Sequence, residues 1–420
     1  MRRIARIAGK IAVGIGIVLL LLIAGIFTMV AQPYWPMVFG ILAIAGFIAL
    51  AAWLSKRFAV VLAILCLLIA ALATGTQLSA SPSPIVDAQG RVVPGSIAEM
   101  RTVNLGGIDQ WIVIRGRNLN NPILLSLAGG PGESALVLSK VVPQLEDHFV
   151  VVNWDQRGAG KSAGVFFADY AHMTPQQYVS DGLQLTNYLR QRFHRDQIYL
   201  TGASWGSLLG VWMAQKHPEW YRAYIGISQV VNWRQMELLE YQLTIQYARQ
   251  FGDTQVVQTL ESNGPPPYAG NAYTILKKDI FDLNYPNEAY MSKLLDAAGV
   301  HPKSAVPITD PSDSPEYGLA GRVSYYVGVG LVFVRMYEQL LEVDLMTQVP
   351  RLNVPVFLAS GRLDINTPQV LTEQWYQALQ APTKQLVWFD SGHTIVSDAP
   401  NEYSDFMFNT VLAQTQGPGI

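Results

Sequence analysis

The sequence predicts an α/β fold in which a mostly parallel, eight-stranded sheet is covered by helices on both faces. After residue 100, short apolar runs rich in Val, Ile and Leu alternate with segments of helical periodicity, which is the pattern of buried parallel strands joined by helices. Between residues 231 and 351 this alternation stops and only helical periods occur. The sequence therefore predicts a sheet domain, residues 96–230 and 352–420, with a helical cap inserted at 231–351.

Residues 1–75 differ from the rest of the chain and predict a membrane anchor. The stretches 11–31, 37–54 and 58–74 lack charged residues, and each is about long enough for the roughly 30 Å hydrocarbon core of a bilayer. We therefore expect three transmembrane helices. A secretory signal peptide is the alternative for the first stretch, but its apolar region is long and lacks a clean small-x-small cleavage site.

Basic residues predict how this anchor is oriented. Four precede the first apolar stretch and two lie between the second and third: Arg2, Arg3, Arg6, Lys10, Lys56 and Arg57. Because cytoplasmic loops are enriched in Lys and Arg, we expect a cytoplasmic N-terminus and, after three crossings, an extracytoplasmic catalytic domain. No acidic residue, histidine or lysine interrupts the apolar stretches, which favours anchoring in the lipid bilayer over transport.

The elements of the sheet domain follow a linker rich in Ser, Pro and Gly at residues 76–95. The expected strands are residues 101–105 and 108–116, paired as a hairpin, and then 122–130, 149–156, 197–204, 221–229, 354–361 and 385–392. The expected helices of this domain are residues 133–148, 174–193, 205–220, 367–379 and 401–414. Strands and helices thus alternate on both sides of the cap.

The segment GASWG, Gly202 to Gly206, contains the candidate nucleophile Ser204. It matches G-x-S-x-G between an expected strand and an expected helix, where the serine sits on a strained turn with its hydroxyl exposed. A structural glycine-rich turn is the alternative for this pattern alone. The strand before the motif and the helix after it favour the nucleophile.

A serine hydroxyl needs a base within hydrogen-bonding reach and an acid that orients this base. The strand at 354–361 leads to Asp364 and the strand at 385–392 leads to His393, in the chain order Ser, Asp, His that this architecture requires. Asp390 is the rival acid, but it precedes His393 by only three residues on the same strand end. We therefore predict Asp364 as the orienting acid and His393 as the base.

An oxyanion hole usually consists of two backbone N–H groups directed at the developing negative charge. One should come from Trp205, directly after the nucleophile, and the other from Gly130 in the glycine-rich loop AGGPGES that follows an earlier strand. A plain Gly/Pro turn is the alternative for that loop. The sequence thus supplies every part of a serine hydrolase site.

Composition limits the other functions. Only 14% of the residues are charged and the formal net charge is -2, so no large basic surface indicates nucleic acid as a partner. The single cysteine, Cys66, can form neither an internal disulfide nor a cysteine metal cluster. We expect no cofactor and no metal ion.

Five motifs together make the sheet domain resemble the α/β-hydrolase superfamily, and within it the proline iminopeptidase-like branch. They are GGPG at 129–132, DQRGAGKS at 155–162, GASWGS at 202–207, GRLD at 361–364 and SGH at 391–393. The combination is specific, although GxSxG alone is not, and it spans nearly the whole sheet domain. The resemblance implies an α/β-hydrolase fold and a scaffold role for Asp155 and Arg157.

The chain departs from this branch in two places. Its relatives usually have a histidine before GGPG, whereas this chain has Ala128. Proline iminopeptidases also resemble one another in placing cap glutamates where these can hold the free amino group of the substrate. Glu237 and Glu240 are the candidates here, without a close match to the pattern of the relatives.

We therefore expect a membrane-anchored serine hydrolase that forms an acyl-enzyme with a small molecule or short peptide, as an aminopeptidase of the proline iminopeptidase type. A carboxylesterase or lipase-like hydrolase is the alternative, because the same acyl-enzyme cycle also cleaves esters. A non-catalytic binding module on this fold is a remote alternative, because all three members of the triad are present. The oligomeric state is left open.

Overall fold

The computed structural model describes residues 80–136, 141–163, 172–300 and 314–416. The three stretches expected to cross a membrane lie outside these residues. Within the described part, no helix has the length and apolar character that a membrane crossing requires.

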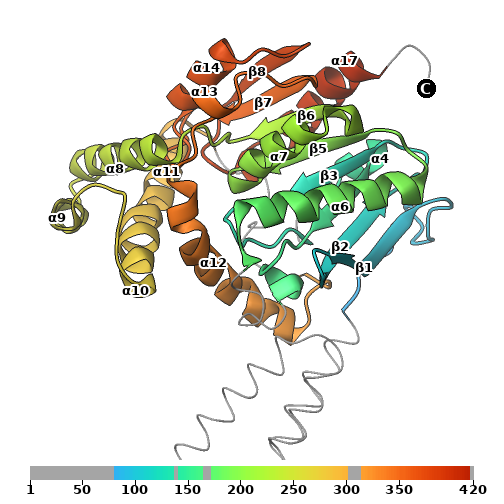
Figure 1. Ribbon diagram of the computed structural model, residues 1–420, viewed down its shortest axis with the longest axis horizontal. Helices are drawn as coiled ribbons and strands as arrows, with labels where there is room; N and C mark the ends of the chain where they lie inside the picture. Colours follow the sequence, from blue (N-terminus) through green and yellow to red (C-terminus); the bar gives the residue numbers. More distant parts are fainter. Residues whose placement is uncertain (1–79, 137–140, 164–171, 301–313, 417–420) are drawn as a thin grey trace, which may run out of the picture.

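An eight-stranded sheet runs through the molecule (Figure 1). Its strands are β1 (Ile97–Leu105), β2 (Ile108–Gly116), β3 (Ile123–Leu127), β4 (Val150–Trp154), β5 (Ile198–Ala203), β6 (Tyr221–Ile227), β7 (Val356–Gly361) and β8 (Lys384–Phe389). They lie in the order β1-β2-β4-β3-β5-β6-β7-β8. The pairs β1–β2 and β2–β4 are antiparallel and all the others are parallel, which confirms the expected mostly parallel sheet.

The parallel register brings the carboxyl ends of the central strands to one edge of the sheet. Leu127 at the end of β3 pairs with Gly202 of β5, and Gly361 at the end of β7 pairs with Phe389 of β8. Loops that leave these ends are therefore neighbours, although the chain between them is long. This edge is where ligands bind in open α/β sheets.

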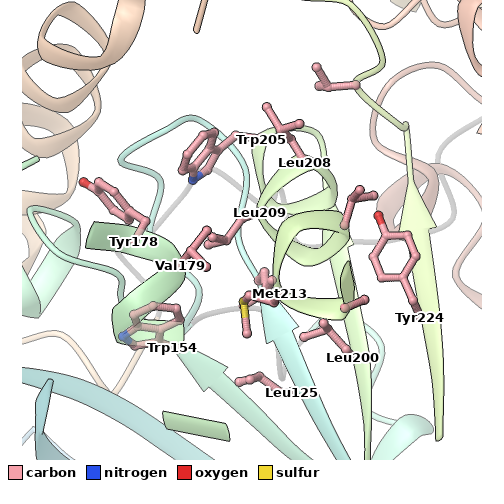
Figure 2. Close-up of a cluster of buried hydrophobic side chains, with 14 of the residues drawn as sticks. Leu125, Trp154, Tyr178, Val179, Leu200, Trp205, Leu208, Leu209, Met213 and Tyr224 are labelled. Carbon is pink, nitrogen blue, oxygen red and sulfur yellow. The ribbon is translucent and has the colours of Figure 1, made fainter. Parts of the chain in front are cut away.

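Helices cover both faces of the sheet because alternate strand residues point to opposite sides. On one face, α6 (Pro175–Phe193), α7 (Trp205–Lys216) and α14 (Gln369–Ala378) pack on residues such as Leu125 and Leu358. Figure 2 shows side chains of this cluster, among them Leu125 of β3 and Leu209 and Met213 of α7. On the other face, α4 (Leu145–His148), α15 (Ile395–Asp398), α16 (Pro400–Asp405) and the π-helix η7 (Phe406–Leu412) pack on residues such as Leu124 and Phe357.

The expected helix at 133–148 is wrong over most of the part that the structure describes. Residues 133–135 are not helical, and α4 covers only Leu145–His148. The backbone N–H of Ala135 and the hydroxyl of Ser134 donate to the Asp155 carboxylate instead. Pro143 also lacks the N–H that a helix interior needs.

The final expected helix, 401–414, is present but irregular. It consists of α16, the π-helix η7 and α17 (Ala413–Thr415) in direct succession. The chain therefore stays helical there, while the hydrogen-bonding pattern changes from α to π and back.

Helices alone occupy the described chain between β6 and β7, and Figure 1 shows them gathered beside the sheet. They are α8 (Trp233–Gln250), α9 (Thr254–Asn263), α10 (Ala272–Ile275), the π-helix η5 (Leu276–Asn284), α11 (Tyr285–Ala297), α12 (Leu319–Leu340) and α13 (Leu345–Gln348). Asn232 begins α8, and its side chain accepts from the backbone N–H of Gln235, the usual helix N-cap. We call these helices the cap.

Candidate active site

Ser204 lies on a sharp turn between β5 and α7 at the carboxyl edge of the sheet. Its φ of 52° and ψ of -122° lie in a region that side chains rarely adopt. The turn is tight: a methyl group on Gly202 would overlap the carbonyl oxygen of Gly206, and one on Gly206 would overlap that of Leu127. Glycine is therefore required on both sides of the serine, as expected for an exposed nucleophile on a strained turn.

His393 and Asp364 are in contact at the same edge. His393 Nδ1 lies 3.0 Å from Asp364 Oδ2 and 3.1 Å from Oδ1. The side chain of Asp364 is fully buried and that of His393 is 18% exposed. The loops after β7 and β8 thus join two of the predicted site residues, which are separated by 28 intervening positions in the sequence.

Thr367 holds the carboxylate of Asp364 in place, and it was not among the residues predicted from the sequence. Its backbone N–H donates to Asp364 Oδ1 at 2.9 Å and its hydroxyl donates to Oδ2 at 2.6 Å. The spacing of three residues is the signal that was available, because Asp side chains commonly accept from the backbone N–H two or three residues later. These two donors hold the Asp364 carboxylate in the orientation in which it contacts the imidazole of His393.

Asp390, the rival acid, points elsewhere. Its side chain is 77% exposed and pairs with Arg362 at 3.2 Å. Of the two aspartates that the sequence offered, the structure therefore brings Asp364 to His393.

The loop that carries His393 is fixed by contacts to its backbone. The hydroxyl of Ser228 donates to the carbonyl oxygen of His393 at 2.8 Å, and the N–H of Gly392 donates to Asp398 Oδ2 at 2.9 Å. Neither Ser228 nor Asp398 was predicted from the sequence, because nothing in the local pattern links them to this loop. They restrict the position of the imidazole.

The charge on His393 is set by opposing effects. Burial lowers the pKa of the imidazole and is the largest single effect, whereas the Asp364 carboxylate raises that pKa through its charge and its hydrogen bond. Two further carboxylates, Glu133 and Glu288, raise the pKa of His393 in the same direction. The imidazole therefore has a pKa above its ordinary value.

The glycine-rich loop after β3 lies beside Ser204. A methyl group built on Gly129 would lie 3.4 Å from Ser204 Cβ and 2.7 Å from Glu133 Oε2. Gly130 has a φ of 103°, a conformation that favours glycine. Gly130 and Trp205, the predicted oxyanion donors, are thus in the two segments that meet at Ser204.

Gln156 connects these two segments and explains how the loop is supported where Ala128 replaces histidine. Its Nε2 donates to the carbonyl oxygen of Ala128 at 3.2 Å, and its Oε1 accepts from Trp205 Nε1 at 2.9 Å. The glutamine is buried. It therefore links the loop after β3 to the start of α7.

Two charged groups of the DQRGAGKS motif are engaged in internal contacts, in agreement with the expected scaffold role. Arg157 forms a buried ion pair with Asp181 at 2.8 Å. Asp155 is buried and accepts from Ser134, Ala135, Lys161 and Tyr317.

The predicted cap glutamates, Glu237 and Glu240, both lie on α8, and a third acid, Asp279, approaches them from η5. We call these three residues the cap acids. All three are buried, at 2%, 3% and 2% exposure. Glu237 accepts from Trp233 Nε1 at 2.8 Å and from the hydroxyl of Tyr337 at 3.1 Å. Burial raises the pKa of Glu237 to about 7.

The other two cap acids, Glu240 and Asp279, accept fewer hydrogen bonds than would satisfy their carboxylate oxygens. Glu240 Oε1 accepts from Asn287 Nδ2 at 2.5 Å, and Asp279 Oδ1 is buried without a hydrogen-bond donor in the structure. Burial raises the pKa of both carboxyls well above the ordinary value, and mutual repulsion among the acids adds to this. Within the described residues, no group of three His, Cys, Asp or Glu side chains is arranged to bind a metal ion.

The sheet, the serine on its turn and the contact between His393 and Asp364 define an enzyme of the α/β-hydrolase fold. A family model described as "Serine aminopeptidase, S33" matches residues 123–399. The chain belongs to this family of serine aminopeptidases, and the expectation of a hydrolytic enzyme is confirmed.

Curated relatives agree with this class. A probable aminopeptidase, YbaC of Bacillus subtilis (strain 168), is 29% identical over 316 residues, which cover 74% of this chain and 95% of that protein. A proline iminopeptidase of Lactobacillus delbrueckii subsp. lactis is 26% identical over 319 residues, which cover 74% and 96%. The protein is thus an α/β-hydrolase similar to serine aminopeptidases.

Solved structures share the fold. The proline iminopeptidase-related protein TTHA1809 from Thermus thermophilus superposes with a TM-score of 0.51 at 19% identity, covering 76% of this chain and 98% of that one. VinJ superposes with a TM-score of 0.52 at 18% identity, covering 75% and 98%.

Proposed function

We propose that the protein is a serine aminopeptidase in which Ser204, His393 and Asp364 form the catalytic triad. The observation that carries this proposal is the contact of His393 Nδ1 with Asp364 at 3.0 Å, on the sheet edge where Ser204 occupies its strained turn. Membership of the serine aminopeptidase family supports it.

In this proposal, each ring nitrogen of His393 has one task. Because Nδ1 faces the Asp364 carboxylate, Nδ1 carries the proton and Nε2 is the free base. Nε2 takes the proton of the Ser204 hydroxyl as Oγ attacks the substrate carbonyl carbon. The imidazolium that forms is stabilised by Asp364.

The rest of the cycle follows from this assignment. The tetrahedral intermediate collapses when His393 Nε2 gives its proton to the leaving amine, and an ester between Ser204 and the acyl group remains. Water, deprotonated by Nε2, then hydrolyses that ester and restores the serine. The N–H groups of Gly130 and Trp205 stabilise the negative oxygen in both halves.

Labelling of the full-length protein with a fluorophosphonate probe tests the nucleophile. Wild-type protein should be labelled at Ser204, and Ser204→Ala should not. Thermal unfolding of both full-length proteins shows whether the substitution has disturbed the fold. Equal labelling of the two would rule out Ser204 as the nucleophile.

Amide cleavage at a free amino terminus is favoured over ester cleavage because the relatives with the longest matches are named aminopeptidases. Rates on amino-acyl arylamides and on short acyl esters distinguish the two. An enzyme that cleaved only the esters would be a carboxylesterase. The preference for an N-terminal proline stays a prediction.

We also propose that residues 11–74 anchor this domain to a membrane, with the N-terminus in the cytoplasm and the catalytic domain outside it. Three uncharged apolar stretches and the basic residues beside them support this proposal. A reporter that works only outside the cytoplasm, fused after Gly75, should be active. A reporter that works only inside would be active instead if the three-crossing model were wrong.

A further inference from the structure

We propose that the α-ammonium group of the substrate binds to Glu133 and Glu288, beside His393, and not to the cap acids. This inference rests on the proposed aminopeptidase function, because such a substrate carries a free ammonium group next to the bond that is cleaved. Glu133 and Glu288 would then determine specificity for a free amino terminus. Neither was a candidate from the sequence.

The covalent structure of the substrate restricts where its ammonium group can lie. A single carbon atom separates the α-nitrogen from the scissile carbonyl carbon, and that carbonyl must approach Ser204 Oγ to about 3–3.5 Å. A carboxylate that holds the ammonium group must therefore lie close to Ser204 and to the loop after β3.

Glu133 satisfies this requirement. It follows the GGPG loop directly, and its Oε2 lies 2.7 Å from the point where a methyl group on Gly129 would be, while Ser204 Cβ lies 3.4 Å from the same point. The carboxylate of Glu133 and the nucleophile thus border the same small space. Glu133 is mostly but not fully buried, so part of its side chain remains accessible.

Glu288 approaches the same site from the cap. It lies on α11, three residues before Met291, so both side chains are on one face of the helix. The N–H of Ile365 donates to Met291 Sδ at 3.5 Å, and a methyl group on Gly392 would lie 3.4 Å from the same sulfur. This face of α11 therefore lies over the loops that carry Asp364 and His393, and Glu288 is exposed there.

Two carboxylates, those of Glu133 and Glu288, lie around His393, and among the described residues no permanently charged cation balances them. Burial raises the pKa of Glu133, the neighbouring Glu288 adds to the increase, and His393 opposes it. In the described part of the chain, neither glutamate has a lysine or arginine as an ion-pair partner. A cation bound between the two carboxylates would remove their repulsion, and the α-ammonium group is the cation that an aminopeptidase substrate supplies.

The cap acids fit the same role less well. At 2–3% exposure they are closed to solvent, and both oxygens of Glu237 already accept hydrogen bonds. Binding an ammonium group there would require the cap to open. Glu240 and Asp279 keep unpartnered oxygens, which makes Glu240→Gln the informative competing variant.

The experiment compares two substrates of one acyl size, an alanine arylamide and a propionyl aryl ester, which lacks the amino group. Glu133→Gln, Glu288→Gln and the double variant are measured with wild type in the full-length protein. Glu338→Gln, which removes an exposed charge on α12, serves as the matched control. KM and kcat are determined separately for each substrate.

The expected result is a rise in KM for the alanine arylamide of roughly 10- to 100-fold in Glu133→Gln and Glu288→Gln, the range for a lost hydrogen bond to a charged group. The double variant should lose more. Hydrolysis of the propionyl ester should change by less than about 3-fold, because that substrate has no ammonium group to lose. Glu240→Gln should affect the two substrates alike.

Two results would overturn the inference alone. One is selective loss of arylamide cleavage in Glu240→Gln with none in Glu133→Gln and Glu288→Gln, which would assign the ammonium group to the cap acids. The other is an equal loss on both substrates in Glu133→Gln, which would indicate an effect through His393 and not through the substrate. Wild-type protein that cleaves the ester and no arylamide would overturn the proposed function together with the inference.

Discussion

Asp155 and Asp364 are both buried aspartates that follow parallel strands, β4 and β7, yet their surroundings differ. Asp155 is surrounded by donors that belong to the scaffold: the hydroxyls of Ser134 and Tyr317 and the backbone N–H groups of Ala135 and Lys161. Asp364 receives two donors from Thr367 and then contacts the ring of His393. One carboxylate is enclosed by fixed donors, and the other contacts a group that can change its charge.

The two aspartates show that a carboxylate at the end of a strand can have different roles, depending on its hydrogen-bond partners. Burial raises the pKa of Asp155 and four fixed donors oppose that increase, so the aspartate holds separate segments together. The partner of Asp364 is an imidazole, which can gain or lose a proton, and the Asp364 carboxylate helps to raise its pKa. Within this protein, Asp155 has four fixed donors, whereas Asp364 has two from Thr367 and shares its oxygens with the imidazole of His393.

The largest effect should come from Asp364→Asn, which keeps the shape of the side chain and removes its charge. If the proposed triad operates, the imidazolium loses its stabilising partner and the His393 ring can take the wrong tautomer, so kcat should fall about 10⁴-fold, the effect known for the same change in a Ser-His-Asp protease. Steady-state kinetics on an amino-acyl arylamide measure this fall. Nearly normal kcat would remove Asp364 from the triad.

Asp155→Ala should have the opposite profile and mainly destabilise the domain. Four donors would lose their acceptor, and each buried donor left unsatisfied costs about 1–3 kcal/mol. We expect the free energy of unfolding to drop by at least about 3 kcal/mol in denaturant titration. The activity per folded molecule, measured by active-site titration, should stay within about 3-fold of wild type. If protein that is still folded lost roughly 10³-fold of its activity, Asp155 would affect activity as Asp364 is expected to.

Tyr317→Phe tests the contribution of one donor to Asp155 with a smaller change. It removes a single hydroxyl that donates to Asp155 at 2.9 Å, and a hydrogen bond to a charged group contributes about 1.5–3 kcal/mol. Unfolding should therefore become easier by about 2 kcal/mol, with kcat unchanged. A loss larger than that of Asp155→Ala would mean that Tyr317 acts through other contacts.

The smallest effect concerns pH. In the proposed mechanism His393 must be neutral to act as the base, and its pKa is raised. The value of kcat/KM should therefore fall on the acid side with a midpoint above about 6.5, the ordinary histidine value. Because the Glu133 charge contributes to this increase, Glu133→Gln should move the midpoint to lower pH, whereas Tyr317→Phe should leave it in place. A pH profile with the propionyl ester separates this effect from ammonium binding, and an upward shift in Glu133→Gln would contradict the assigned charges.

Local patterns predicted much of the fold and of the proposed triad. Apolar runs marked all eight strands, and strand ends followed by polar residues marked Ser204, Asp364 and His393. Local patterns failed at residues 133–135, where a helix was expected. Propensity favoured the helix, but Ser134 and Ala135 donate to Asp155, about twenty residues away along the chain, and a long-range hydrogen bond has no local signature.

The sequence by itself determined the order of strands and helices, the motif at Ser204 and the hydrolase class, because periodicity and turn chemistry are local properties of the chain. Only the tertiary structure decided which aspartate contacts His393, how Gln156 supports the loop beside Ala128, and which glutamates lie around His393. Glu133 and Glu288 are separated by more than a hundred positions in the sequence. The loop after β3 places Glu133 beside Ser204, and the packing of α11 places Glu288 over the loops that carry Asp364 and His393. Packing between distant segments cannot be derived from the residues of either segment alone.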